Sequence, residues 1–154
     1  MSGLCSQFRF CGAVALVAVV AALAGTALGV EPTVEELKAR LSSASIGDRT
    51  HLCIQIAEKQ LAVVNKSYAG SEDEKAQAAL TDVVTYSELA RDYAIQSHKR
   101  EKQTEIAVRG MIRKLTDIMH SLGHVDQAPV HDAISRLQHV RDDLLAAMFP
   151  KGAK

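Results

Sequence analysis

Residues 71–122 decide the fold of this chain, and they read SEDEKAQAALTDVVTYSELARDYAIQSHKREKQTEIAVRGMIRKLTDIMHSL. The segment has no proline and one glycine, Gly110, so these helix-breaking residues do not interrupt it. Alternate steps of four and three from Ala76 give a mostly apolar series: Leu80, Val83, Ser87, Ala90, Ala94, Ser97, Glu101, Thr104, Val108, Met111, Leu115, Ile118 and Leu122. A continuous helix must keep this register, so we predict one helix over residues 72–122.

The polar stretch from Gln96 to Glu105 leaves two architectures open. If the helix is continuous, two shorter helices pack along it, and the chain forms elongated antiparallel hairpins that share one long central helix. If the chain turns within the polar stretch, it forms a compact four-helix bundle. Both alternatives are all-α.

Capping signals predict the two helices that precede this segment. Thr33 followed by Glu36 forms a capping box at the start of a helix over residues 33–43. A cluster of serines ends that helix, and Asp48 or Thr50 can cap a second helix over residues 48–69. Gly70 suits a C-terminal cap with positive φ.

Similar signals bound the helices that follow. Ser71 and Glu74 match a second capping box, which starts the helix over residues 72–122 directly after the turn. Gly123 then reads as a stop, and Pro129 as the first turn of a helix over residues 129–148. The apolar stripe of this last helix consists of Val130, Ile134, Leu137, Leu144 and Met148.

The N-terminal stretch predicts export from the cytoplasm. Residues 10–30 contain no charged side chain, Arg9 precedes them, and the small residues Ala27 and Gly29 suit a cleavage site. We predict a signal peptide at residues 1–29 and a single α-helical domain at residues 30–154, periplasmic or secreted. The alternative is an uncleaved anchor, because the stretch reaches the ~20 residues of a spanning helix. We expect membrane contact only through such an uncleaved segment.

Composition and motifs argue against several functions. The formal net charge is zero, whereas a nucleic-acid-binding protein carries a marked basic excess, so we expect no nucleic-acid partner. No nucleophile lies in a glycine-flanked turn, and the haem motif Cys-x-x-Cys-His is missing. We therefore predict no enzymatic activity, no catalytic residues and no cofactor.

Three histidines are the candidates for a metal site. His120, His124 and His131 lie close in sequence around the predicted turn, with Asp117 one turn before His120, and could supply zinc or copper ligands. The simpler interpretation is a set of solvated histidines near helix ends. Our primary prediction contains no metal, and a periplasmic metal-binding or envelope-stress-sensing protein is the alternative function.

The run from His98 to Lys102 is the most basic in the chain. It could attract an acidic partner or lipid headgroups. The simpler interpretation is a solvated helix middle, with its charge balanced by Asp92, Glu101 and Glu105.

The apolar flanks of the predicted helices suggest how the protein works. In the predicted helices over residues 48–69 and 72–122, the apolar stripe is broader than the contact between two packed helices requires. The residues that flank these stripes are Cys53, Ile56, Val63, Ala79, Val84 and Tyr86. Either the helix over residues 33–43 or a second copy of the chain covers these flanks. We therefore predict a protein-protein interaction or structural module with a protein partner or self-association, and a buried Cys53.

Two resemblances are limited to short features. The segment Tyr68–Ala76 resembles the turn between the helices of a tetratricopeptide repeat, but no 34-residue period recurs. The design as an exported helical protein is similar to periplasmic helical-hairpin chaperones and metal-stress sensors. Their Leu-Thr-x-x-Gln signature is not met, because Met119 stands where Gln belongs. The sequence is therefore assigned to no family.

Overall fold

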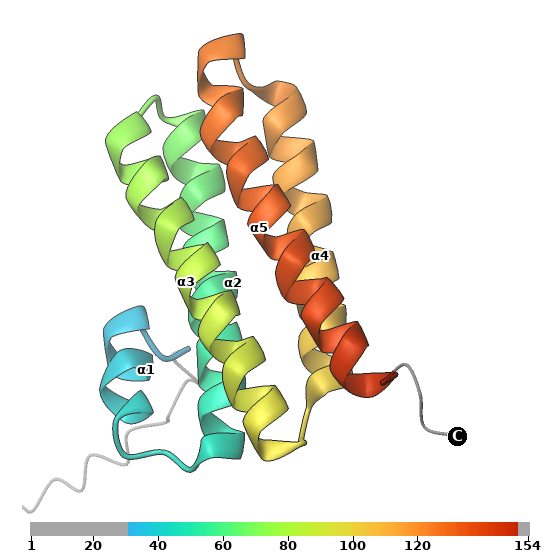
Figure 1. The fold of residues 1–154 in the computed structure, drawn as a ribbon. Helices are drawn as coiled ribbons and strands as arrows, with labels where there is room; N and C mark the ends of the chain where they lie inside the picture. The colour runs from blue at the N-terminus through green and yellow to red at the C-terminus, as the bar shows by residue number, and fades with distance from the viewer. Residues whose placement is uncertain (1–30, 151–154) are drawn as a thin grey trace, which may run out of the picture. The chain divides into compact units, whose positions relative to one another are not determined.

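A computed structural model describes residues 31–150 of the chain, and these form five helices and no strand (Figure 1). The helices are α1 (Val34–Leu41), α2 (Ile46–Ala69), α3 (Asp73–Ser97), α4 (Glu101–Ser121) and α5 (His124–Met148). The predicted all-α class is confirmed. Residues 31–150 belong to one compact unit, and the predicted signal peptide at residues 1–29 lies outside the described residues.

The N-terminal caps of α1 and α2 follow local side-chain chemistry. The predicted capping box of α1 is confirmed, since Thr33 Oγ1 accepts from the Glu36 amide at 3.3 Å and the Glu36 carboxylate accepts from the Thr33 amide at 3.0 Å. For α2, Asp48 and Thr50 were the wrong caps. Ser45 has the extended backbone that a cap requires, and its Oγ accepts from the Asp48 amide at 3.3 Å.

The turn from α2 to α3 uses Ser71, rather than Gly70, as its left-handed residue. Ser71 has φ 57°, whereas Gly70 has φ −92°. The amide of Glu72 donates to the Ser67 carbonyl at 2.9 Å, which completes a Schellman motif. The predicted capping box of Ser71 and Glu74 is therefore wrong: Glu72 precedes α3, and its side chain makes no capping hydrogen bond.

The predicted continuous helix over residues 72–122 is also wrong, because the chain turns at residues 98–100. His98 adopts φ 51° and Arg100 φ 67°, both in the left-handed region. The amide of Lys99 donates to the Ala94 carbonyl at 3.3 Å and that of His98 to the Ile95 carbonyl at 3.3 Å, again as a Schellman motif. Histidine and arginine here take a role that glycine usually fills.

Burial of the α4 stripe explains why the chain turns here. Each left-handed residue without glycine's freedom costs about 1–2 kcal/mol. Folding α4 back buries Val108, Met111 and Leu115 in a core shared with α2, α3 and α5. Full burial of one such side chain contributes about 1.5–3 kcal/mol, so the added burial against α2 and α3 needs to supply only part of this for each residue to outweigh the strain of two turn residues.

Helix α5 begins five residues earlier than predicted, at His124. Gly123 precedes it with an extended backbone and is the N-terminal cap of α5 rather than a stop that follows α4. Pro129 therefore lies inside α5 and cannot donate to the carbonyl of Val125, four residues earlier. The Val125 side chain is 88% exposed, so the helix tolerates the missing bond at a solvated end.

One apolar core joins the four longer helices. Figure 1 shows α2 beside α3 and α4 beside α5, with the second helix of each pair running back along the first. The core cluster contains Ala57, Leu61, Val64, Leu80, Val83, Val108, Met111, Leu115, Val130, Leu137, Val140 and Leu144 among others. The predicted stripe of the last helix lies in this core at Val130, Ile134, Leu137 and Leu144.

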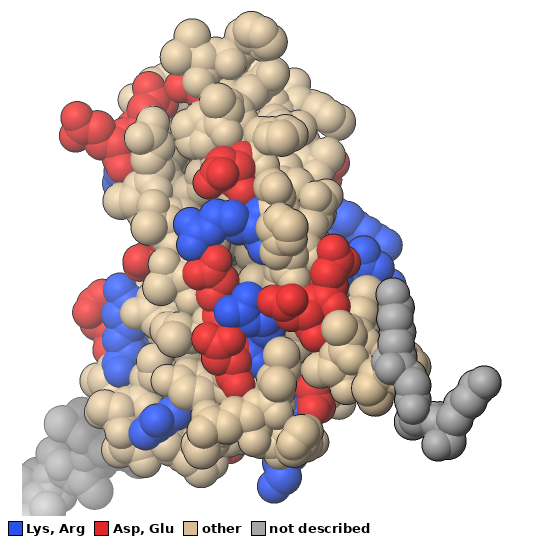
Figure 2. All heavy atoms as spheres, in the orientation of Figure 1, with Lys and Arg blue, Asp and Glu red and all other residues tan. Residues whose placement is uncertain are grey.

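Ion pairs connect α3 to α5 on the surface of this core. Arg91 Nη1 lies 2.9 Å from Asp143 Oδ2, and Arg136 Nη2 lies 2.8 Å from Glu88 Oε1. Figure 2 shows cationic and anionic side chains side by side on the face formed by α3 and α5. Charges on this face therefore largely neutralise one another.

Candidate functional site

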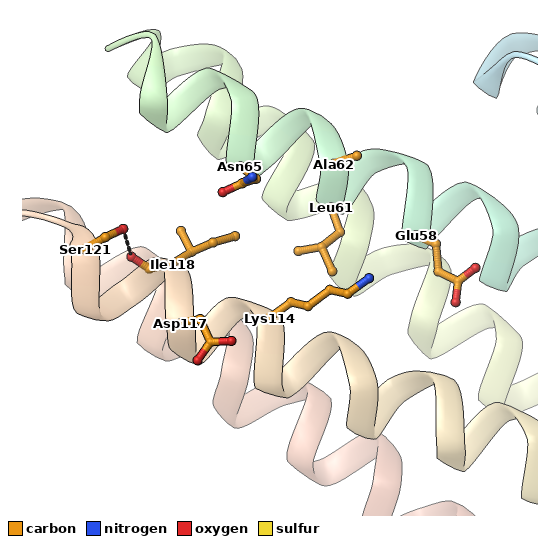
Figure 3. Close-up of a pocket in the computed structure, with 8 residues that line it drawn as sticks. All are labelled: Glu58, Leu61, Ala62, Asn65, Lys114, Asp117, Ile118 and Ser121. Atoms are coloured by element: carbon orange, nitrogen blue, oxygen red, sulfur yellow. Dashed lines mark hydrogen bonds between the residues drawn. The ribbon is translucent and has the colours of Figure 1, made fainter.

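A groove between α2 and α4 is the candidate site. It has a volume of about 460 Å³ and receives side chains from only these two helices. Its lining consists of Glu58, Leu61, Ala62 and Asn65 from α2, and Lys114, Asp117, Ile118 and Ser121 from α4 (Figure 3).

Apolar side chains form the floor of the groove, and polar side chains form its rim. Leu61 and Ile118 point into the space between the helices in Figure 3 and are only 3% and 8% exposed. The rim residues are exposed, and the Lys114 side chain runs along the groove towards Glu58. No carboxylate of residues 31–150 lies within 4.0 Å of the Lys114 ammonium, so its charge is not neutralised by an ion pair in the described structure.

Beside the groove, the polar contacts of α4 reach α5, and none of those within residues 31–150 reaches α2. Glu105 of α4 is nearly buried, and its Oε1 accepts from Arg141 Nε of α5 at 2.9 Å. The side-chain hydrogen bond that α2 makes to another helix within residues 31–150 reaches α3, from Gln60 Nε2 to Asp82 Oδ2 at 2.7 Å. Polar contacts thus tie α2 to α3 and α4 to α5, and leave the space between α2 and α4 unfilled.

A second hollow continues the groove along α2. It has a volume of about 490 Å³, shares Glu58 and Ala62 with the first, and extends to Glu31 and Pro32. The exposed surface of α2 from Gln55 to Asn65 is thus hollowed on both sides of Ala62.

The lining determines what the groove can do chemically. It contains no histidine or cysteine, and its charged groups are two carboxylates and one ammonium on the rim. An apolar floor between polar edges is the pattern that binds the apolar face of an amphipathic helix. The groove therefore suits non-covalent contact with another protein.

The apolar flanks that suggested a missing partner are covered within the chain. Cys53 and Ile56 are fully buried, and α1 packs against α2 with Leu37 only 1% exposed. Val84 and Ala79 lie inside the main core, and Tyr86 and Val63 pack against it. The helix predicted over residues 33–43 corresponds to α1, which packs against α2. The burial of these flanks within one chain gives no evidence for a second chain.

The candidate metal ligands do not form a cluster. His120 lies in the last turn of α4, His124 starts α5, and His131 lies further along α5, all exposed. Within residues 31–150, no group of three or more His, Cys, Asp or Glu side chains is arranged to hold a metal ion. Asp117 instead lines the groove. No observation on the described residues favours the alternative metal-binding function.

Cys53 is a buried thiol rather than a reactive one. Its side chain is fully buried, and loss of solvation raises the pKa of the thiol from 9.0 to about 12, while the nearby Arg49 has a smaller opposing effect. Because the thiolate is the nucleophilic form, Cys53 is not expected to react in the folded protein. The predicted burial of Cys53 is confirmed.

Sequence reasoning missed the groove because its lining consists of ordinary surface residues. Glu58, Ala62 and Asn65 look like the solvated face of a helix, and their opposite side, α4, was predicted to extend away from α2. No residue pattern indicates the site, because the turn at residues 98–100 that brings α4 beside α2 carries neither glycine nor proline.

No protein-family model matches the chain, and no curated protein or solved structure shows significant similarity to it. Among the helices at residues 31–150, none is both long and apolar enough to cross a lipid bilayer.

Proposed function

We propose that this is an exported, non-enzymatic module that binds an amphipathic helix of a partner protein in the groove between α2 and α4. The observation that carries the proposal is the unfilled groove of about 460 Å³, with an apolar floor between two exposed polar rims. Protein interiors are close-packed, so an open apolar groove suits a binding surface.

The dimensions of the groove suit a helical partner. The lining of α2 from Glu58 to Asn65 spans about 11 Å at the rise of an α-helix, which matches about two turns of a bound helix. A partner with two apolar residues three or four positions apart would meet Leu61 and Ile118. Glu58, Asp117 and Lys114 on the rim would select its flanking charges.

Site-specific photo-cross-linking at Ala62 tests the proposal. A cross-linking amino acid at this exposed groove position should join the protein to its partner in cells that produce the full chain. The matched control is Ala78, an exposed alanine on α3 that lines no described pocket. We expect a specific product from position 62 only, and its mass identifies the partner or a second copy of the chain.

Equal products at both positions, or none at position 62, would contradict the groove as the contact surface. An Ala62→Trp variant provides an independent check, because the indole ring would occupy the groove without changing a core residue. It should abolish cross-linking from a probe at Asn65, whereas Ala78→Trp should not.

Export is the second part of the proposal, and it rests on residues 1–29. Their basic start, uncharged apolar stretch and small residues before the cut are the features of a secretory signal peptide. N-terminal sequencing of the protein recovered outside the cytoplasm should give Val30 or Glu31 as the first residue. Full-length chain in the membrane fraction would instead establish the anchored form.

A further inference from the structure

The turn between α3 and α4 carries cations that form no ion pair with the described part of the chain. Lys99, Arg100 and Lys102 are exposed, and within residues 31–150 none of them has a carboxylate within 4.0 Å. His98 begins the same turn and is also exposed. His98 and Arg100 have positive φ angles, and Figure 1 shows the turn at one end of the bundle, where it joins α3 to α4.

The acidic residues expected to balance this run are engaged elsewhere. Asp92 pairs with Arg91 at 2.8 Å. Glu105 is nearly buried and pairs with Arg141 at 2.9 Å and Arg109 at 3.6 Å. Of Asp92, Glu101 and Glu105, only Glu101 remains beside the turn without another partner among the described residues. The sequence predicted a neutral, solvated helix middle here, whereas the structure has a basic turn.

Apolar side chains are exposed at the same end of the helices. The hydrocarbon stem of Lys99 lies 3.9 Å from the position that a Cβ would take on Gly47, which places the start of α2 beside the turn. Ile46 of α2 is 40% exposed, and Phe149, directly after α5, is 71% exposed. Figure 1 shows the end of α5 and the start of α2 at the end of the bundle that holds the α3–α4 turn. Ile106, in the second turn of α4, is 48% exposed.

We propose that this end of the bundle docks onto the surface of an anionic lipid bilayer. Cationic side chains attract anionic headgroups, and neighbouring exposed apolar side chains insert into the boundary between headgroups and acyl chains. A nucleic acid would engage the cations but give no reason for Phe149, Ile46 and Ile106 to be exposed towards the same end of the bundle. Lysine and arginine stems also suit this boundary, because they bury hydrocarbon while their charges stay in water.

This surface is separate from the groove proposed for a protein partner. The groove uses Lys114 to Ser121 of α4, whereas the docking surface uses the turn and the first turns of α4. It is also independent of the N-terminal stretch, through which alone the sequence predicted membrane contact. A protein docked in this way would keep its groove accessible to a partner.

Binding to lipid vesicles tests the proposal with the chain from Glu31 to Lys154, the form expected after cleavage of the signal peptide, so that the apolar N-terminal stretch cannot bind the vesicles. Vesicles of phosphatidylcholine with 30% phosphatidylglycerol are compared with vesicles of phosphatidylcholine alone by co-sedimentation at low and high salt. We expect binding only to the anionic vesicles, weakened by salt. Failure to bind them, or equal binding to both, would overturn the proposal.

Two variants of equal charge locate the surface. The triple change Lys99→Gln, Arg100→Gln and Lys102→Gln should weaken binding on the order of 100-fold, because each cation near an anionic membrane contributes about fivefold. The control triple Lys66→Gln, Lys75→Gln and Arg113→Gln removes the same charge from other exposed sites and should weaken it less than about threefold. Equal weakening would overturn the location.

A third variant separates a bilayer from other anionic partners. Changing Ile106 and Phe149 to serine keeps every charge and should weaken vesicle binding about tenfold, since both side chains are predicted to insert. Binding to heparin, a soluble polyanion, should not change. Unaltered vesicle binding would overturn the bilayer as the occupant and favour an acidic macromolecule. Thermal melts followed by circular dichroism verify that each variant is folded.

Discussion

Helix α4 is held very differently on its two sides. Towards α5, Leu115 packs in a core with the fully buried Leu137 and Leu144, and the pair of Glu105 and Arg141 closes the contact. Towards α2, the floor of Leu61 and Ile118 opens into a groove, and no side-chain hydrogen bond of the described residues crosses it. The contact with α5 therefore stabilises the fold, and the side facing α2 holds the groove that we propose as a binding site.

The largest expected effect comes from breaking the closed side. Leu137→Ala should lower the free energy of unfolding by about 2–5 kcal/mol, through lost burial and the cavity that remains. This is a large share of the ~5–15 kcal/mol typical of a domain. Urea denaturation measures the change.

The matched change on the open side is Asn65→Ala, which should alter stability by less than about 0.5 kcal/mol because this groove residue is exposed. Comparable losses at Leu137 and Asn65 would contradict the contrast between the two sides.

A smaller loss is expected from the ion pair between α4 and α5. Arg141→Met keeps much of the side-chain stem but leaves the nearly buried Glu105 with only Arg109 at 3.6 Å. We expect a loss of about 1–3 kcal/mol, the usual cost of removing a hydrogen-bonded partner from a buried charge. Lys114→Met is the control on the open side and should be nearly neutral. Equal melting temperatures for Arg141→Met and Lys114→Met would contradict a stabilising role for the ion pair.

Cys53 lies on the buried side of α2, and the pH dependence of stability tests its burial. Burial raises the pKa of Cys53 to about 12, whereas the unfolded thiol ionises near 9. Only the unfolded state loses this proton between these values, so stability should fall as pH rises from about 9 towards 12. Changing Cys53 to alanine should reduce the loss at pH 10 by about 1 kcal/mol. Parallel pH profiles for both proteins would show that Cys53 is solvated.

The smallest effect has the opposite sign and tests the turn that creates both sides of α4. His98→Gly should stabilise the protein by about 0.5–1 kcal/mol, because glycine adopts φ 51° without steric cost. In a continuous helix the same change would destabilise by about 1 kcal/mol. The sign of the change in melting temperature therefore distinguishes the two architectures, and a decrease would contradict the turn at residues 98–100.

Much of the helix content was predictable from local chemistry. The capping box of Thr33 and Glu36 acts within four residues, so it is visible in the sequence and present in the structure. The repeat that begins at Ala76 likewise identified core positions on both sides of the break, including Val83, Val108 and Leu115. Periodicity records which face is buried, and that face is the same whether the helix continues or turns back.

The turn itself was not predictable, and for the same reason. A shared core lies against α3 and α4, so the apolar register passes through the turn unchanged. The residues with left-handed backbone are Ser71, His98 and Arg100. Unlike glycine, these residue types rarely adopt a positive φ, so the packing of whole helices holds them in this conformation.

The sequence by itself determined that the described residues are helical, which faces of those helices are apolar, and that Cys53 is buried, because these properties depend on periodicity and local caps. Only the tertiary structure decided that α4 returns along the core. That return opens the groove beside α2 and exposes the basic turn, because both features require residues from separate helices to come together. Their positions depend on long-range packing free energy, which no local pattern of residues records.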